Sequence, residues 1–301
     1  MKFKTDKEIL MAHAELFIPN REELLSLKTH EPLIQFEILP PKGISEGRQS
    51  RVSILEYSVE GVSRRVIWKR MGVGKNLTES EAKILQSRLV PYRGELVGSG
   101  WNIPEIYHSQ IVPVSSEFQI FSYEQYIPGG DGQLMVENPD EPQFLKWMLL
   151  RKVIESLASY SDIGEIEVQG EKLSGLPQGL DLKLANIVVE RETGKMFFVD
   201  LFGPKEIKDG KWLTYSKKLD SLSESNLMAI AASREGMILR LYRLIEQKWV
   251  ESGGITQERL RKNLFHLLDN SSLPEKEVSL IKREIGANFP WLDKIYSERQ
   301  I

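Results

Sequence analysis

The sequence predicts an α+β fold in which a small antiparallel sheet with one main helix precedes a larger, mostly helical part. Residues 36–127 carry most of the strand signal, in short segments rich in Val, Ile, Tyr and Trp. After Pro128-Gly129-Gly130, apolar side chains recur mainly at helical spacing. The change of period at this Pro-Gly segment predicts two domains that join there.

The chain has the composition of an ordinary globular protein. Of its 301 residues, 41% are hydrophobic and 28% are charged, which excludes wholesale disorder. It contains no cysteine, which excludes disulfides, thiolate metal sites and a cysteine nucleophile. The formal charge of −3 argues against nucleic acid as the main partner. No apolar stretch approaches the ~20 residues that span a bilayer and no export signal is evident, so we expect a cytoplasmic protein without a membrane partner.

The first part of the chain divides into an extension and a sheet. Residues 1–35 are expected to form two short helices, whose role the sequence does not indicate. Beyond them, β-branched and aromatic residues predict strands, and one apolar-periodic segment predicts the main helix. The strands are Phe36–Leu39, Arg51–Val59 and Arg65–Arg70, with a turn at Glu60-Gly61, and the helix covers about Thr78–Leu89.

The second part is expected to be helical apart from a single strand hairpin. Apolar residues repeat at helical spacing over most of its length, and β-branched residues concentrate around one turn. The predicted elements are a hairpin of Asn186–Glu190 with Lys195–Asp200, a long helix over Ser223–Ser252, and helices that begin at Thr256 and Pro274.

Three polar residues flank this hairpin in a specific order. Asp181 is followed five positions later by Asn186 and fourteen positions after that by Asp200. The segments D-L-K-L-A-N and D-L-F-G that contain them resemble the D-L-K-x-x-N catalytic loop and the D-F-G metal motif of the protein-kinase-like superfamily. In character the resemblance is closest to small-molecule phosphotransferases of the aminoglycoside and choline type.

This resemblance implies a bilobal protein-kinase-like fold with ATP and Mg²⁺ as cofactors. Residues 36–127 correspond to an N-lobe, a small nucleotide-binding antiparallel sheet with one main helix. Residues 128–301 correspond to a larger, mostly helical C-lobe with the catalytic loop, the metal site and the acceptor-binding helices. Residues 1–35 are an N-terminal helical extension outside both lobes.

By the same resemblance, four C-lobe residues take catalytic and metal-binding roles. Asp181 orients the acceptor hydroxyl and accepts its proton, and Lys183 stabilises charge on the γ-phosphate. Asn186 and Asp200 hold Mg²⁺, for which amide and carboxylate oxygens are suitable ligands. Each residue alone also suits a plain turn or strand end, so the prediction depends on their order together.

In the N-lobe, Val66-Ile67-Trp68-Lys69 resembles the V-A-I-K strand, whose lysine binds the α- and β-phosphates. A glutamate on the next helix is expected to pair with Lys69. Glu81 begins the segment E-A-K-I-L, which resembles the E-A-x-x-L start of this helix in small-molecule phosphotransferases. Glu79 is an alternative partner.

Two further segments are implied to contact the nucleotide. Gly47 to Val52 resembles the G-x-x-S-x-V phosphate-covering turn of the aminoglycoside group, with Gly47 and Ser50 as its signature residues. The segment E-Q-Y-I-P resembles the hinge of choline and ethanolamine kinases. By that match, the Gln125 carbonyl and the Ile127 N–H bind the adenine edge.

Departures from the pattern favour a small-molecule hydroxyl as acceptor. Gly179 and Leu180 stand where these families place His and then Arg or Gly, and no A-P-E follows Asp200. Lys183, however, is the residue of protein serine kinases at its position, so a protein serine/threonine kinase stays as an alternative. A catalytically silent kinase-like scaffold is a third possibility. The sequence indicates neither the acceptor, nor ATP over GTP, nor the oligomeric state.

Overall fold

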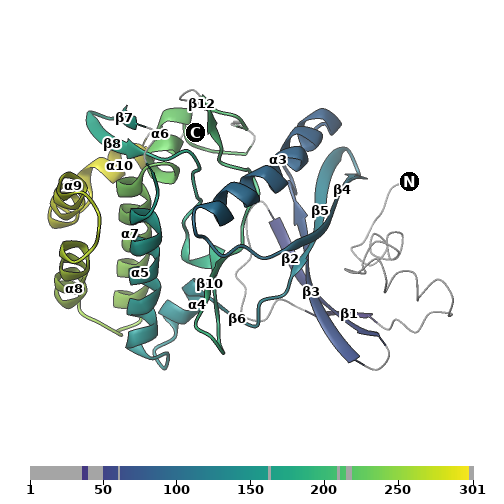
Figure 1. The fold of residues 1–301 in the computed structure, drawn as a ribbon, viewed down its shortest axis with the longest axis horizontal. Coiled ribbons are helices and arrows are strands. Elements are labelled where there is room, and N and C mark those ends of the chain that lie inside the picture. Colours follow the sequence, from purple (N-terminus) through teal and green to yellow (C-terminus); the bar gives the residue numbers. More distant parts are fainter. Residues whose placement is uncertain are drawn as a thin grey trace. The chain divides into compact units, whose positions relative to one another are not determined.

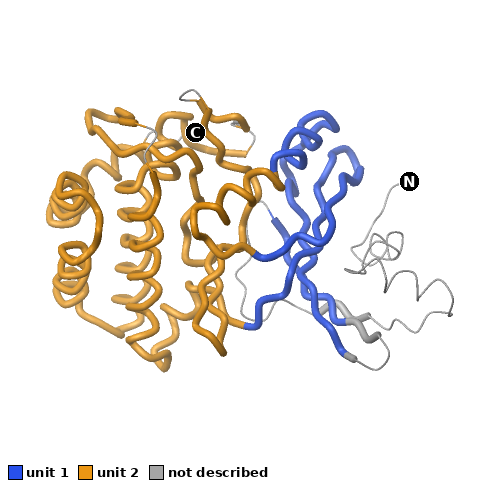
Figure 2. The backbone as a smooth tube through the Cα atoms, in the orientation of Figure 1, with its two compact units in different colours: residues 1–88, 104–128 blue, residues 89–103, 129–301 orange. Residues whose placement is uncertain are grey.

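The computed structural model describes residues 36–39, 50–59, 62–161, 164–208, 211–214 and 219–297. The expected helices of residues 1–35, the turn at Glu60-Gly61 and the phosphate-loop residue Gly47 lie outside these ranges. The chain divides into two compact units (Figure 2). Unit 1 comprises residues 1–88 and 104–128, and unit 2 comprises residues 89–103 and 129–301.

Unit 1 contains the small antiparallel sheet that the sequence predicts (Figure 1). Its five strands lie in the order β1-β2-β3-β5-β4, and every pair of neighbours is antiparallel. The strands are β1 (Phe36–Leu39), β2 (Ser50–Val59), β3 (Val62–Met71), β4 (Ile106–Val114) and β5 (Glu117–Gln125).

The register of β3 against β5 separates two sets of side chains. Trp68 lies opposite Tyr123, and Lys69 lies opposite Ser122. Because successive side chains of a strand point to opposite faces, the Trp68 pair and the Lys69 pair occupy different faces of the sheet. Trp68 and Tyr123 are both buried, and Trp68 also packs on Phe121 with ring centroids 5.6 Å apart. This apolar packing fixes the strand that carries Lys69.

The main helix, α3 (Glu79–Gly98), begins where it was predicted but extends nine residues beyond the expected end at Leu89. Pro91 lies inside it and removes one backbone donor, which favours an earlier end. However, Leu89, Tyr92 and Leu96 are all buried. Burial of this apolar face outweighs the local cost of the proline, because helices in proteins are stabilised mainly by tertiary packing. The two units divide within this helix, between Arg88 and Leu89.

Unit 2 is mostly helical, as predicted, and α7 forms its centre (Figure 1). This helix contacts six other helices, and its residues 237–239, 241 and 242 are fully buried. No helix within the described residues combines the length and apolarity needed to cross a membrane. The helices are α4 (Gly132–Glu137), α5 (Gln143–Ala158), α6 (Glu224–Ala231), α7 (Arg234–Glu251), α8 (Gln257–Asp269), α9 (Glu275–Gly286) and α10 (Pro290–Ser297).

Unit 2 contains more strand pairs than the single hairpin that the sequence predicted. The predicted hairpin is present as β9 (Ile187–Glu190) and β10 (Met196–Phe198), and β6 (Gly129–Asp131) pairs with β9. A second hairpin joins β7 (Gly164–Val168) to β8 (Glu171–Gly175). Its two turn residues, Gln169 and Gly170, both have positive φ, the conformation that a two-residue hairpin turn needs. A short pair of two-residue strands, β11 (Ile207–Lys208) and β12 (Lys211–Trp212), was also missed.

The long helix predicted over Ser223–Ser252 is broken into α6 and α7 at Ala232-Ser233. The Ser233 hydroxyl accepts a hydrogen bond from the Gly236 N–H at 3.0 Å and donates one to the Ala229 carbonyl at 2.5 Å. Serine at this N-cap position satisfies a donor that the start of α7 leaves open. The apolar spacing continued across the break, so periodicity alone did not show it.

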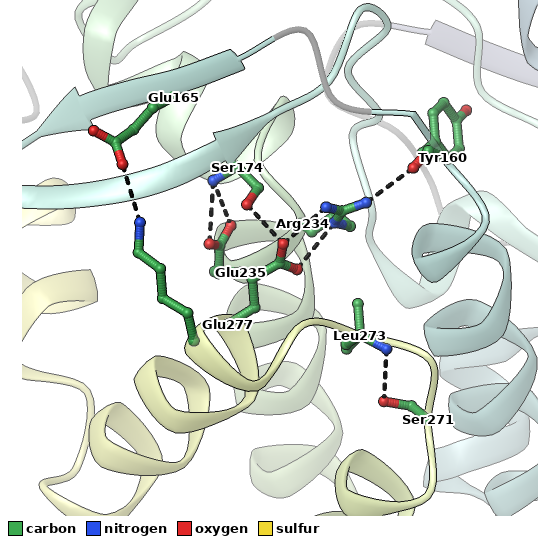
Figure 3. A network of polar contacts seen from close by, with 9 residues as sticks. Tyr160, Glu165, Ser174, Arg234, Glu235, Ser271, Leu273 and Glu277 are labelled. Atoms are coloured by element: carbon green, nitrogen blue, oxygen red, sulfur yellow. Dashed lines mark hydrogen bonds and ion pairs between the residues drawn. The ribbon is translucent and has the colours of Figure 1, made fainter.

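A buried polar network ties the start of α7 to β8 and α9 (Figure 3). Arg234 makes two hydrogen bonds to the carboxylate of Glu277, at 2.9 and 2.8 Å, and a third to the Tyr160 carbonyl at 2.9 Å. Ser174 donates its N–H to Glu235 at 3.1 Å and its hydroxyl to Glu277 at 2.6 Å. These contacts anchor the helix that faces the candidate site.

Candidate catalytic loop and nucleotide-binding residues

Backbone hydrogen bonds fix the loop that leads into the D-L-K-L-A-N segment of unit 2. Leu180 donates its N–H to the Ala231 carbonyl at 2.6 Å, and Gly179 donates its N–H to the Lys205 carbonyl at 2.7 Å. The hydroxyl of Tyr92 donates to the Gly179 carbonyl at 2.5 Å. The break between α6 and α7 therefore supplies a carbonyl that holds this loop.

Gly179 stands where the motifs that this segment resembles carry histidine, and its surroundings explain the difference. A Cβ atom at this position would overlap the Ala231 carbonyl oxygen and lie 2.6 Å from the Trp212 ring. Such an approach is far inside van der Waals contact, so only glycine fits between the two neighbours. The departure seen in the sequence is a packing requirement of this chain.

The loop brings Asp181, Lys183 and Asn186 together. Residues Leu184–Asn186 form a 3₁₀ turn, and the Asn186 side-chain amide donates to the Asp181 carbonyl at 2.8 Å. The Lys183 ammonium lies 2.6 Å from Oδ2 of Asp181. The Lys183 N–H also donates to the Asp181 carbonyl at 2.8 Å. Lys183 and Asn186 therefore both contact Asp181 through hydrogen bonds.

Asp200 joins the same cluster through the strand hairpin. The Val199 N–H donates to the Asn186 carbonyl at 2.9 Å, which places the next residue, Asp200, beside the loop. Oδ1 of Asp200 accepts the Phe202 N–H at 3.2 Å, and Gly203 takes a positive φ of 68°. The turn after Asp200 therefore depends on the glycine that ends the D-L-F-G segment.

Two further cations surround Asp181, and neither was predicted from the sequence. The Arg240 guanidinium, on α7, lies 2.7 Å from Oδ1 of Asp181. Burial raises the pKa of Asp181, but the charges of Arg240, Lys183 and Lys205 outweigh it and hold the pKa well below its usual range. Arg240 lies within a long apolar-periodic segment 59 positions from Asp181, so no local signal connects the two residues.

The donor set of Asn186 and Asp200 fits Mg²⁺. The amide nitrogen of Asn186 is engaged by the Asp181 carbonyl, so the amide presents its oxygen as the remaining ligand atom. Amide and carboxylate oxygens are the ligands that this hard cation prefers, with phosphate oxygens and waters completing its shell. Within the described ranges, no three His, Asp or Glu side chains gather into a metal-binding group.

In unit 1, Lys69 contacts Glu124 on β5, the first residue of the E-Q-Y-I-P segment, for which the sequence predicted no pairing with Lys69. The Lys69 ammonium lies 2.9 Å from Oε2 of Glu124, and the Ser122 hydroxyl donates to Oε1 at 2.6 Å. The carboxylate of Glu81 instead accepts the N–H of Thr78 at 2.7 Å and its hydroxyl at 2.9 Å. Glu79 pairs with Lys83 at 2.6 Å on the helix surface. A role for Glu81 or Glu79 beside Lys69 stays a prediction.

The other predicted nucleotide-binding residues of unit 1 lie at strand ends. Ser50 is the first residue of β2 and is buried opposite Met71. Gln125 is the last residue of β5, where its N–H donates to the Glu105 carbonyl at 2.8 Å. Ile127 follows two residues later and is buried. Contact of Ser50, Gln125 and Ile127 with a nucleotide stays a prediction.

Comparisons with known proteins find similar chains among solved structures. No protein-family model and no curated protein matches the sequence. Among solved structures, the chain is similar to "WaaP in complex with acyl carrier protein", with 12% sequence identity and a TM-score of 0.37 over 87% of this chain and 90% of that chain. A likeness at this level assigns neither activity nor site residues. The antiparallel sheet and helical part described above are compatible with a kinase-like fold.

Proposed function

We propose that this protein is a phosphotransferase that moves the γ-phosphate of ATP to a hydroxyl of a small molecule. The observation that carries the proposal is the hydrogen-bonded group of Asp181, Lys183 and Asn186 in unit 2, with Val199, the residue before Asp200, bonded to the Asn186 carbonyl. These are the residues that the D-L-K-x-x-N and D-F-G resemblance assigns to catalysis and metal binding. The contact between the Asp181–Asn186 loop and the strand end that leads into Asp200 is unexpected if each residue merely ends a turn or strand.

The cluster supports the chemistry that phosphoryl transfer requires. The acceptor oxygen forms a bond to the γ-phosphorus while the bond from that phosphorus to the bridging oxygen breaks, and ADP leaves with the bonding electrons. Asp181 orients the hydroxyl and takes its proton. Lys183 stabilises the transferred phosphate, and Lys69 binds the α- and β-phosphates. When bound at Asn186 and Asp200, Mg²⁺ offsets phosphate charge.

A small-molecule acceptor is favoured over a protein. The chain has no A-P-E sequence after Asp200, and that motif belongs to the peptide-binding segment of protein kinases. The segment after Asp200 instead runs through two-residue strands, β11 and β12, into α6. Residues from about 205 onward are proposed to set acceptor specificity. In this proposal the acceptor binds to helices of unit 2, and no peptide-binding segment is required.

The test is transfer of label from γ-³²P-ATP with Mg²⁺ to a panel of sugars, nucleosides, amino alcohols and antibiotics. Label on a small molecule supports the proposal, and label found on protein alone supports a serine/threonine kinase. Asp181→Asn is expected to abolish transfer and leave ATP binding nearly intact. Asp293→Asn is a matched control, because this exposed aspartate pairs with Arg243 on the surface. Failure of Mg²⁺-ATP to raise the melting temperature supports the silent scaffold.

A further inference from the structure

We propose that Arg240 is a positioning residue that divides the two oxygens of Asp181 between separate tasks. Arg240 holds Oδ1 throughout, whereas Oδ2 exchanges Lys183 for the acceptor hydroxyl. Asp181 is then never without a counter-charge, and one oxygen is aimed at the acceptor. This inference rests on the proposed phosphotransfer and names a residue that neither the motif nor the resemblance assigns.

The backbone that carries Arg240 is fixed. Its neighbours Leu239 and Leu241 are fully buried in the core of unit 2. At the first residue of the same helix, Arg234 is anchored by Glu277 and by the Tyr160 carbonyl. The Arg240 side chain is itself 11% exposed, and its Nη2 lies 2.7 Å from Oδ1. A guanidinium held in this way keeps its geometry with little further loss of side-chain entropy.

Lys183 differs from Arg240 in each of these respects. It lies on the catalytic loop itself, two residues from Asp181, and its side chain is 47% exposed. An ammonium on a flexible, solvated stem exchanges partners readily, because exposed ion pairs contribute little free energy. Lys183 is therefore the cation that leaves Oδ2 and moves toward the γ-phosphate.

The other charges near the pair are consistent with this division. Lys205 also lowers the pKa of Asp181, and its ammonium lies 3.6 Å from Oδ1 of Asp220. Asp220 and Tyr296 both act electrostatically on Arg240, and Tyr92 lies within electrostatic range of Asp181 and Asp200. Because Arg240 lies 2.7 Å from Oδ1, Oδ2 is the oxygen that accepts a hydrogen bond from the hydroxyl once Lys183 leaves it, and Oδ2 takes the proton as the bond to phosphorus forms.

The direct test is a ¹³C NMR titration of the aspartate side-chain carboxyls in the full chain. The Asp181 resonance is identified by its loss in Asp181→Asn. In the wild type this resonance is expected not to titrate from pH 8 down to the onset of acid unfolding. In Arg240→Gln the pKa of Asp181 is expected to rise by about one to three pH units, the effect of removing an adjacent arginine. Arg240→Lys keeps a positive charge, so it is expected to raise the pKa of Asp181 less than Arg240→Gln does. It also provides the test if the glutamine variant does not fold.

Arg243→Gln is the matched control, since Arg243 lies one turn further along α7 and pairs with Asp293 on the surface. It is expected to leave the Asp181 resonance unchanged. An unchanged Asp181 titration in Arg240→Gln, or an equal shift in Arg243→Gln, overturns the inference. The titration needs neither ATP nor an acceptor, so it tests whether Arg240 pairs with Asp181 independently of the proposed function.

A kinetic test separates positioning from mere structural support. Release of labelled phosphate from Mg²⁺-ATP, with water as the acceptor, is expected to fall on the order of 100-fold in Arg240→Gln, the loss typical of a misplaced reacting group. In an Asp181→Asn background the same change is expected to have no further effect, because Arg240 acts through Asp181. Equal losses in both backgrounds overturn the inference. Absence of turnover in the wild type counts against the proposed function, and the titration still decides the ion pair.

Discussion

Lys69 and Glu124 form a buried ion pair inside the sheet of unit 1, with 2.9 Å between Nζ and Oε2 and 6% of each side chain exposed. The pair joins neighbouring strands, and the Ser122 hydroxyl holds the second carboxylate oxygen. This pair orients the Lys69 ammonium within its own sheet. If Lys69 binds phosphates as proposed, Glu124 positions it.

Glu124→Gln is therefore expected to weaken ATP binding at least tenfold and to lower the free energy of unfolding by about 1–3 kcal/mol, because a buried ammonium loses its counter-charge. Glu81→Gln is expected to destabilise the first turn of α3, where the Glu81 carboxylate accepts a hydrogen bond from the Thr78 N–H. It is expected to change ATP affinity little. Titration calorimetry with Mg²⁺ and a non-hydrolysable ATP analogue measures both. The opposite ranking of the two variants would make Glu81 the partner of Lys69.

Glu235 is expected to make stability depend on pH near neutrality. Burial, together with the nearby charge of Glu277, raises the pKa of Glu235 to about 7, against the opposing hydrogen bonds from the backbone. The folded state therefore binds this proton more tightly than the unfolded state, whose carboxyl has an ordinary pKa near ~4.3. The stability that the protonated carboxyl contributes is present below about pH 4 and is lost as pH rises toward 7.

Glu235→Gln mimics the protonated carboxyl, so it is expected to remove this loss. At about 1.4 kcal/mol for each unit of pKa difference, the variant gains about 4 kcal/mol over the wild type at pH 8 and little at pH 4. Urea unfolding from pH 4 to 8.5 measures the difference. A constant gap between wild type and variant across that range would show that Glu235 does not titrate there.

Gly179→Ala is expected to destabilise unit 2 by about 1–3 kcal/mol, since the added methyl group overlaps the Ala231 carbonyl and the Trp212 ring. Gly94→Ala is the matched control, because a Cβ there meets nothing within 4 Å and the residue lies inside α3. The control is expected to stabilise the protein by about 0.5–1 kcal/mol, the helix preference of alanine over glycine. Denaturant unfolding compares the two, and equal effects would contradict the packing account of Gly179.

Local contacts explain why the sequence could indicate part of the candidate site. Asp181, Lys183 and Asn186 are bonded to one another within six residues, and Asp200 reaches them through an adjoining hairpin. Contacts within such short segments follow from the order and spacing of the residues, so the sequence alone can indicate them. The strand-rich first part and the helical second part were likewise visible in the hydrophobic periods.

The residues that were missed depend on long-range packing. Glu124 reaches Lys69 only because β5 pairs with β3, and Arg240 reaches Asp181 only because α7 packs against the catalytic loop. The extension of α3 past Pro91 has the same origin, since burial in unit 2 outweighs local preference. The spacing of residues in the sequence does not indicate strand register or helix packing. The contacts of Glu124 with Lys69 and of Arg240 with Asp181 could therefore not be predicted from the sequence.

The Arg234–Glu277 pair leads to a final prediction about the support of α7. Both side chains are buried, and the guanidinium makes two hydrogen bonds to the carboxylate. Glu277→Ala leaves an arginine without its counter-charge in the core, which is expected to cost about 3–5 kcal/mol of unfolding free energy. Glu165→Ala is the control, since Glu165 pairs with the exposed side chains of Lys172 and Lys276. It is expected to leave the free energy of unfolding unchanged within error.

A double replacement distinguishes the cost of an orphaned charge from the value of the pair itself. Arg234→Met combined with Glu277→Leu removes both charges and keeps apolar volume, so it is expected to recover most of the stability that Glu277→Ala loses. The Tyr160 carbonyl and the Ser174 hydroxyl each lose one partner in that variant, which limits the recovery. Chemical denaturation of Glu277→Ala, the control Glu165→Ala and the double variant at one pH measures their free energies of unfolding. If the double variant were no more stable than Glu277→Ala, the hydrogen bonds to Tyr160 and Ser174, rather than the balance of charge, would be what anchors α7.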